Sequence, residues 1–155
     1  MPVFGKVTLQ CEGNKASIIN TTNNEQWKYP QLSQGWELSA ETRNITEKEV
    51  PYWIRTAKEH PEWGILDADQ VADYPVIRKI RPGERFSPYG MGGRTQKLSD
   101  FLINNRIPEQ YRADLAVAAD EGGIVWIPGL RVSNRCALHP GTHRIMILKL
   151  EIGTE

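Results

Sequence analysis

The chain has 155 residues, of which 39% are hydrophobic and 25% charged, and its 19 Lys and Arg balance its 19 Asp and Glu. This length allows one domain or two small ones with a real hydrophobic core, and the composition is that of an ordinary globular protein. No run approaches the roughly 18 apolar residues of a membrane helix, and the N-terminus lacks the charged start and apolar stretch of a secretion signal. These patterns argue against a membrane-spanning helix and a secretion signal, and we expect a cytoplasmic protein with no membrane partner.

The first part of the chain, residues 1–50, is predicted to be a small β-rich unit. Residues 3–10 and 35–43 alternate with a period of two, and residues 16–20 and 26–29 are β-rich runs interrupted by Gly, Asn and Pro. The dipeptides Gly13-Asn14 and Asn23-Asn24 are suited to hairpin tips. These patterns predict a small antiparallel sheet.

The remainder, residues 51–155, is predicted to be an α+β domain. A polar, acidic connector spans residues 46–51, and the pattern of residues 52–58 suits a strand or a short helix equally well. Two short helices are expected at about 97–105, where Leu98, Phe101 and Leu102 have helical spacing, and at 108–112, which starts with a proline. Strands are predicted at residues 63–67, 75–81, 115–119, 123–127 and 144–150. The fold class is thus α+β, with mostly antiparallel β strands and two short helices in the second half.

Basic charge is concentrated in one segment, residues 78–112. This segment contains eight Lys or Arg and three acids, so its formal charge is +5, whereas residues 1–77 carry −4 and residues 113–155 carry −1. Within it, residues 82–93 are rich in Gly and Pro, which forces an irregular backbone. The pattern indicates a surface that meets an anion.

Four motifs in and after this segment form a distinctive string. They are Arg81-Pro82-Gly83-Glu84-Arg85-Phe86, Pro88-Tyr89-Gly90-Met91-Gly92-Gly93, Lys97-Leu98-Ser99-Asp100-Phe101 and Trp126-Ile127-Pro128-Gly129-Leu130-Arg131. This string resembles the C-terminal domain of bacterial tRNA(Ile)-lysidine synthetase. The resemblance is dense over residues 75–150 and faint before them.

The resemblance implies a role in tRNA modification. In that family an N-terminal ATP-pyrophosphatase domain, which needs ATP and Mg²⁺, adenylates the anticodon cytidine of a minor isoleucine tRNA and joins lysine to it. The C-terminal region is implied to hold the tRNA, chiefly at the acceptor stem. The sequence has no counterpart of the catalytic Ser-Gly-Gly-x-Asp-Ser loop. We therefore expect a non-catalytic part of this ligase, with the tRNA and the ATP-pyrophosphatase domain as partners and no cofactor of its own.

The candidate tRNA-binding residues are mostly cations of the basic segment, because guanidinium groups can bond phosphate in a bidentate manner. Tyr89 is a candidate for stacking on an exposed terminal base, and Gly90, Gly92 and Gly93 form a candidate backbone anion loop before a helix. The cationic candidates are Arg78, Arg81, Arg85, Arg94, Lys97, Arg106, Arg112 and Arg131. Structural alternatives stay open at this point, since Asp100 could pin Arg81 or Arg85, and Arg131 could pair with Glu121.

Other functions have weaker support in the sequence. A protein-interaction module that docks on and orients the catalytic domain without touching RNA is the main alternative. An autonomous enzyme is disfavoured, because no arrangement of nucleophile and base or of paired carboxylates stands out. No metal site is expected, because Pro140-Gly141 would break a helix between His139 and His143. Cys11 and Cys136 lack metal-ligand spacing and are expected to be reduced, partly buried thiols.

Overall fold

The computed structural model describes residues 29–152. The predicted strands at 3–10 and 16–20, the turns at 13–14 and 23–24, Cys11 and nearly all of the run 26–29 lie outside the described residues. The described strands are β3 (Trp36–Asn44), β4 (Gly64–Asp67), β5 (Val76–Arg78), β6 (Arg85–Phe86), β7 (Gln96–Lys97), β8 (Val117–Asp120), β9 (Gly123–Ile127), β10 (Arg131–Val132) and β11 (Arg144–Ile152). The α-helices are α2 (Val50–Glu59) and α3 (Leu98–Asn104), and the 3-10 helices are η2 (Leu32–Gln34), η3 (Glu47–Glu49), η4 (Ala68–Gln70), η5 (Glu109–Tyr111) and η6 (Asn134–Cys136).

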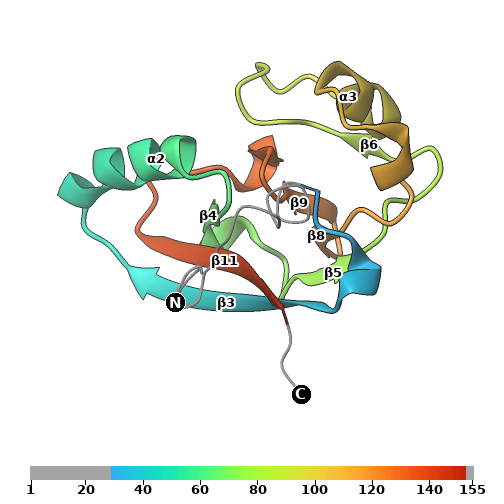
Figure 1. Ribbon diagram of the computed structural model, residues 1–155. Coiled ribbons are helices and arrows are strands. Elements are labelled where there is room, and N and C mark those ends of the chain that lie inside the picture. The colour runs from blue at the N-terminus through green and yellow to red at the C-terminus, as the bar shows by residue number, and fades with distance from the viewer. Residues whose placement is uncertain (1–28, 153–155) are drawn as a thin grey trace.

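Two antiparallel sheets form the centre of the molecule. One has the strand order β3-β11-β4 and the other has the order β10-β9-β8-β5. β3 pairs with β11 over its whole length, from Trp36 opposite Ile152 to Asn44 opposite Arg144. The two strands run side by side along the lower edge in Figure 1, so the first and the last described strands belong to one sheet. The division of the chain near residue 50 stays a prediction.

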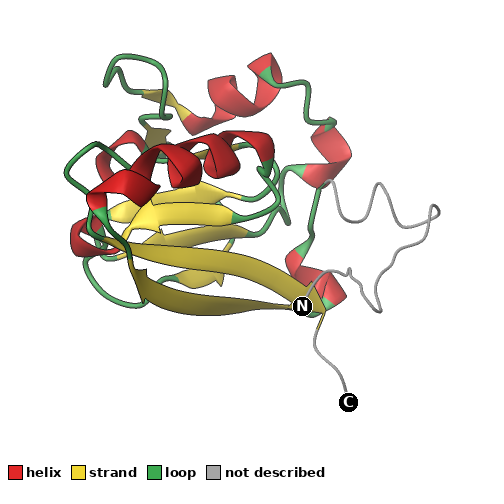
Figure 2. Cartoon of the chain, turned by 90° about the vertical axis from the view of Figure 1, so that its left-hand side faces the viewer, coloured by secondary structure: helices red, strands yellow, loops and turns green. Residues whose placement is uncertain are grey.

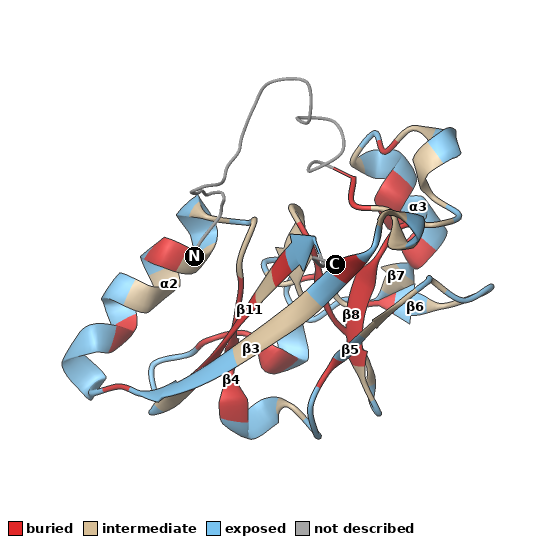
Figure 3. Cartoon of the chain, turned by 60° about the horizontal axis from the view of Figure 1, so that its bottom comes forward, coloured by how far each residue is buried: buried red, intermediate tan, exposed pale blue. Residues whose placement is uncertain are grey.

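The sheets face each other, and the two α-helices cover their outer faces. Side chains alternate along a strand, so β11 contributes to two cores: Met146 joins Trp126 between the sheets, whereas Ile145 packs with Ile54 of α2. On the other side of β9, Ile124 packs in a third core with the apolar residues of α3. Figure 3 shows the buried strand β8 between the two helices. The order of layers is therefore α2, sheet, sheet, α3.

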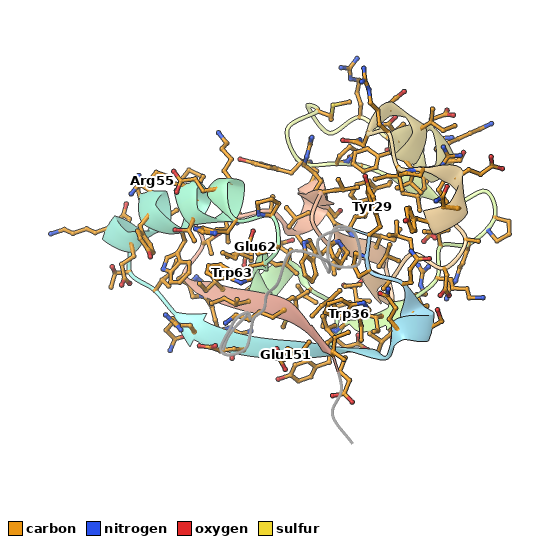
Figure 4. All side chains as sticks on the ribbon, in the orientation of Figure 1. Tyr29, Trp36, Arg55, Glu62, Trp63 and Glu151 are labelled. Carbon is orange, nitrogen blue, oxygen red and sulfur yellow. The ribbon has the colours of Figure 1, made fainter. Side chains whose placement is uncertain are left out.

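The segment that suited a strand or a helix equally well is a helix. Its apolar residues Val50, Trp53, Ile54 and Ala57 recur at helical spacing and pack against the β3-β11-β4 sheet. Pro51 lies in the first turn, where its missing N–H costs nothing. In Figure 4, Trp63 lies between α2 and β11, and Arg55 lies on the helix itself.

The predicted α+β class is confirmed, with antiparallel strands and short helices. Each strand range predicted after residue 62 contains or overlaps an observed strand, although the strand predicted at 75–81 is shortened to β5. The helix predicted at about 97–105 is α3. The second predicted helix, at 108–112, is the 3-10 helix η5. Such short helical segments commonly form i to i+3 hydrogen bonds in place of the i to i+4 bonds of an α-helix. The sequence did not predict β6, β7 and β10, since two-residue strands show no period. Within residues 29–152, no helix has both the length and the apolarity to cross a bilayer.

Candidate nucleic-acid interface

A short β-hairpin presents three of the predicted cations to solvent. β6 pairs with β7 so that Arg85 lies opposite Lys97 and Phe86 lies opposite Gln96. Phe86 is buried and contacts Phe101 of α3 edge-on, with ring centroids 5.2 Å apart. Because residues alternate between the two sides of a strand, Arg85 and Lys97 share the outer side, where both are exposed.

The positive charge of this hairpin is not neutralised by the described part of the protein. Within residues 29–152, Arg85, Arg94 and Lys97 form no ion pair with a carboxylate. Among the described residues, the side chains of Arg85 and Arg94 make only long hydrogen bonds of 3.4 Å, to the carbonyls of Thr95 and Met91. Like charges placed directly opposite on neighbouring strands destabilise the pairing. The hairpin therefore retains an unfavourable charge arrangement that an anionic ligand would relieve.

The loop of the hairpin, residues 87–95, is held at its base and contains three glycines in left-handed conformations. Gly90, Gly92 and Gly93 have φ values of 94°, 67° and 82°, which side chains disfavour. The Tyr89 N–H donates to the Val132 carbonyl over 3.0 Å. β7 separates the loop from α3, so the expectation that the glycines lead directly into a helix is wrong. Figure 2 shows this loop standing over the side of the molecule that α2 covers.

Arg78 is occupied by a structural contact. Its two terminal nitrogens lie 3.1 and 2.6 Å from the two carboxylate oxygens of Glu84, and its side chain is only 17% exposed. Burial alone would raise the pKa of Glu84, but the hydrogen bonds from Arg78 and from the Arg81 N–H, together with the Arg78 charge, hold that pKa below its ordinary value. The pair braces the Pro-Gly turn in front of β6.

The remaining candidates divide by exposure. The side chains of Arg81 and Arg106 are exposed, and Arg106 follows the end of α3 with a φ of 62°. Arg112 is half-buried and its Nε donates to the Ile107 carbonyl over 2.9 Å. Arg131 is also half-buried, and one of its terminal nitrogens donates to the Tyr89 carbonyl over 3.1 Å. It thus ties β10 to the hairpin loop.

The alternatives that the sequence left open are answered by these contacts. Neither Arg81 nor Arg85 pairs with Asp100, because Glu84 is the carboxylate that braces this turn. Arg131 does not pair with Glu121. Phe86 and Phe101 are core residues, each 3% exposed, as their pattern predicts.

One cation near the loop was missed by the sequence analysis. Lys58 of α2 and Tyr89 of the hairpin loop line the same cavity, together with Arg131. Lys58 is exposed, and within the described residues it forms no ion pair. The sequence did not indicate this position of Lys58, because residues 52–58 could not be assigned to a helix. Only the packing of α2 brings Lys58 close to the basic segment.

The histidines and the described cysteine have structural contacts. His139 Nε2 lies 2.7 Å from Asp67 Oδ2, and His143 Nε2 lies 3.2 Å from Asp69 Oδ2. Within residues 29–152, no cluster of three His, Cys, Asp or Glu residues could hold a metal ion. Cys136 is free and buried, and burial raises the pKa of its thiol to about 11.

The matching family model and the sequence relatives indicate one family. Residues 76–148 match the model of the TilS substrate C-terminal domain. The chain is 33% identical over 86 residues to tRNA(Ile)-lysidine synthase of Clostridium acetobutylicum, which covers 56% of this chain. It is 32% identical over 84 residues to the same enzyme of Caldanaerobacter subterraneus subsp. tengcongensis, covering 54%. In both cases the match spans only 18% of the relative's length.

One solved structure leads to the same family. A crystal structure of a TilS C-terminal domain superposes with a TM-score of 0.58 and 25% identity, covering 83% of this chain and 90% of that domain. The matched residues 76–148 contain the basic hairpin, helix α3 and the strand β10, which begins at Arg131. Residues 76–148 therefore belong to the family of TilS substrate C-terminal domains.

Proposed function

We propose that this chain binds the acceptor stem of a minor isoleucine tRNA as the C-terminal region of a tRNA(Ile)-lysidine synthetase. The observation that carries the proposal is the set of exposed cations on the hairpin that have no ion pair within residues 29–152, with Arg85 directly opposite Lys97 and Arg94 in the loop between them. The match to the TilS C-terminal domain supports a tRNA as the anionic ligand of these cations.

The proposed ligand suits the geometry of the hairpin. Double-stranded RNA hides its base edges in a deep, narrow major groove, so proteins recognise it mainly by shape and by contacts to phosphates and 2′-hydroxyls. A narrow projection with cations on its outer side can follow such a backbone. Arg81 and Arg106 are exposed and would extend the contact. Arg78 and Arg112 would contribute mainly by holding the turn and the loop in place.

The proposed role in the reaction is orientation. Contacts with the acceptor stem are remote from the anticodon, and binding energy from remote contacts can position the reacting group. In this proposal the ATP-pyrophosphatase domain of the enzyme binds ATP and Mg²⁺ and carries out the ligation in the cytoplasm. This chain would contribute affinity and selection of the tRNA.

A salt titration with matched variants tests the proposal. The affinity of the chain for an acceptor-stem minihelix is measured at several salt concentrations, for wild type and for Arg85→Ala with Lys97→Ala. Each lost phosphate contact should reduce the slope of log affinity against log salt by about 0.7 to 0.9. The control is Arg43→Ala with Lys48→Ala, which removes the same charge from exposed positions on β3 and η3. Equal slopes for the two double variants would remove the hairpin from the interface.

A second candidate function is docking on the catalytic domain without RNA contact. Tyr74 and Val76, beside and within the outer strand β5, are 69% and 60% exposed, and neighbouring exposed apolar residues can mark a protein interface. If the chain fails to bind tRNA even at low salt, this function gains support. Tyr74→Ser with Val76→Ser should then weaken association with the catalytic domain.

A further inference from the structure

A small cavity opens between α2 and the basic hairpin loop. Its volume is about 120 Å³, well below the roughly 300 to 1,000 Å³ of pockets for drug-sized ligands. It can therefore receive one ring system and excludes a folded peptide element. The lining includes Ile54, Ala57, Tyr89, Trp126, Leu130 and Leu138.

The walls of the cavity are apolar and fixed in place. Trp126 is 1% exposed, and it packs so closely on β4 that a Cβ added to Gly64 would lie 2.5 Å from its ring. Tyr89 is half-exposed, and its backbone is bound on both sides, by the Val132 carbonyl and by Arg131. The cavity therefore has an aromatic wall that is positioned before any ligand arrives.

The rim of the cavity is cationic. Lys58 lies on the α2 side and Arg131 on the β10 side, and within residues 29–152 neither forms an ion pair with a carboxylate. Arg131 uses one terminal nitrogen for the Tyr89 carbonyl, which leaves its other N–H donors available. An aromatic slot between two cations suits a planar base that is attached to phosphate. An apolar side chain of a protein partner would leave both charges without a counter-ion.

The cavity is continuous with the proposed RNA surface. Tyr89 belongs to the loop that carries Arg94, and Gly90 lies next to Arg131, whose terminal nitrogen is 3.9 Å from the place of a Cβ on that glycine. A backbone that follows the hairpin cations would thus reach the rim of the cavity. Bases inside a duplex are stacked and paired, so only an unpaired base is free to enter.

We infer that this cavity binds one unpaired nucleobase at the end of the RNA duplex, with Tyr89 as the stacking surface and Lys58 and Arg131 as contacts for the adjoining phosphate. The inference rests on the proposed RNA-binding function. It adds a site for the single-stranded end to the surface that holds the stem.

The test compares two RNA duplexes, one blunt and one with a single unpaired 3′ 2-aminopurine nucleotide. Stacking on an aromatic side chain should tighten binding of the second duplex roughly five- to hundredfold, and it should quench the 2-aminopurine fluorescence. Tyr89→Leu should abolish the difference between the two duplexes. Ala57→Phe, which fills the cavity from α2, should have the same effect. Tyr52→Leu is the control, because Tyr52 is a half-exposed tyrosine of the same helix that does not line the cavity.

The outcomes separate this inference from the proposed function. If the blunt duplex binds with a steep salt dependence but the unpaired nucleotide gives no gain, the base site is wrong and stem binding stands. If neither duplex binds at low salt, the proposed function fails and the base site fails with it. Competition by free AMP at micromolar concentration would also overturn the inference, because it would assign the cavity to a mononucleotide.

Discussion

Arginines in two regions of this protein have opposite electrostatic surroundings. At the β8–β9 turn, Arg135 forms an ion pair with Asp120, whose side chain is fully buried. At the β6–β7 hairpin, Arg85 lies opposite another cation and, within the described residues, has no carboxylate partner. The same residue type therefore holds the fold together in one place and remains available in the other. Local charge counts cannot distinguish the two cases, whereas the position of the carboxylates does.

The paired region also satisfies backbone groups. Asp120 accepts hydrogen bonds of 2.8 Å from the N–H groups of Ala72 and Gly122. Burial alone would raise the pKa of Asp120, but the hydrogen bonds from Arg135 and the backbone outweigh it and hold the pKa below its ordinary value. A carboxylate with this many partners fixes the loop before β5 to the β8–β9 turn.

The largest expected effect is the loss of stability when Asp120 is removed. Asp120→Ala leaves two backbone N–H groups without their acceptor and removes the carboxylate partner of Arg135, which keeps only its hydrogen bond to the Gly123 carbonyl. It should lower the free energy of unfolding by about 3 kcal/mol. Urea unfolding measures the change. Glu121→Ala is the control, because Glu121 is exposed and its side chain forms no ion pair or hydrogen bond within residues 29–152. Its removal should cost less than about 0.5 kcal/mol. A similar loss in both variants would show that Asp120 does not hold the turn.

A smaller loss is expected at the turn in front of the hairpin. Glu84→Gln keeps the shape of the side chain, but it removes the charge and replaces one of the two oxygens that accept from Arg78 by an NH2 donor. The free energy of unfolding should therefore fall by about 1.5 kcal/mol. Hydrogen exchange of the β6 and β7 amides should accelerate. RNA affinity at low temperature should change little, because Arg78 is a bracing residue in this structure. A large loss of affinity with an unchanged exchange rate would contradict that role.

Acid should weaken the paired region before it affects the cations of the hairpin. The pKa values of Glu84 and Asp120 are lowered from ordinary values of 4.5 and 3.8. Their stabilising contribution is therefore fully present above those values and is lost as the pH falls through the lower values of the folded state. Unfolding experiments between about pH 6 and pH 3 should show this decline, and it should be shallower in Glu84→Gln. An equally steep decline in that variant would show that Glu84 does not contribute to the loss of stability at low pH.

The sequence predicted the basic segment but not the roles of its members. Arg78 and Arg85 look alike in the sequence, and they differ only because the packing of β5 brings Arg78 within bidentate reach of Glu84. The core role of Phe86 and Phe101 followed from local patterns, since burial of apolar residues at regular spacing is a local signal. Lys58 could not be found, because its position depends on how α2 packs across the cavity.

The smallest expected change in stability concerns the hairpin, and it has the opposite sign. Lys97→Glu places a carboxylate opposite Arg85, and replacing a like-charge pair by an ion pair across strands should stabilise the fold by about 0.5 kcal/mol. The same substitution should weaken RNA binding more than Lys97→Ala does, because it adds a repulsive charge where a phosphate would lie and neutralises its neighbour. Thermal unfolding and minihelix affinity are measured on the same samples, with Lys97→Gln as the uncharged control. A variant that gains stability while losing affinity would show that the hairpin cations serve ligand binding although they destabilise the fold. A loss of both stability and affinity would instead place Lys97 with Arg135 among the cations that stabilise the fold.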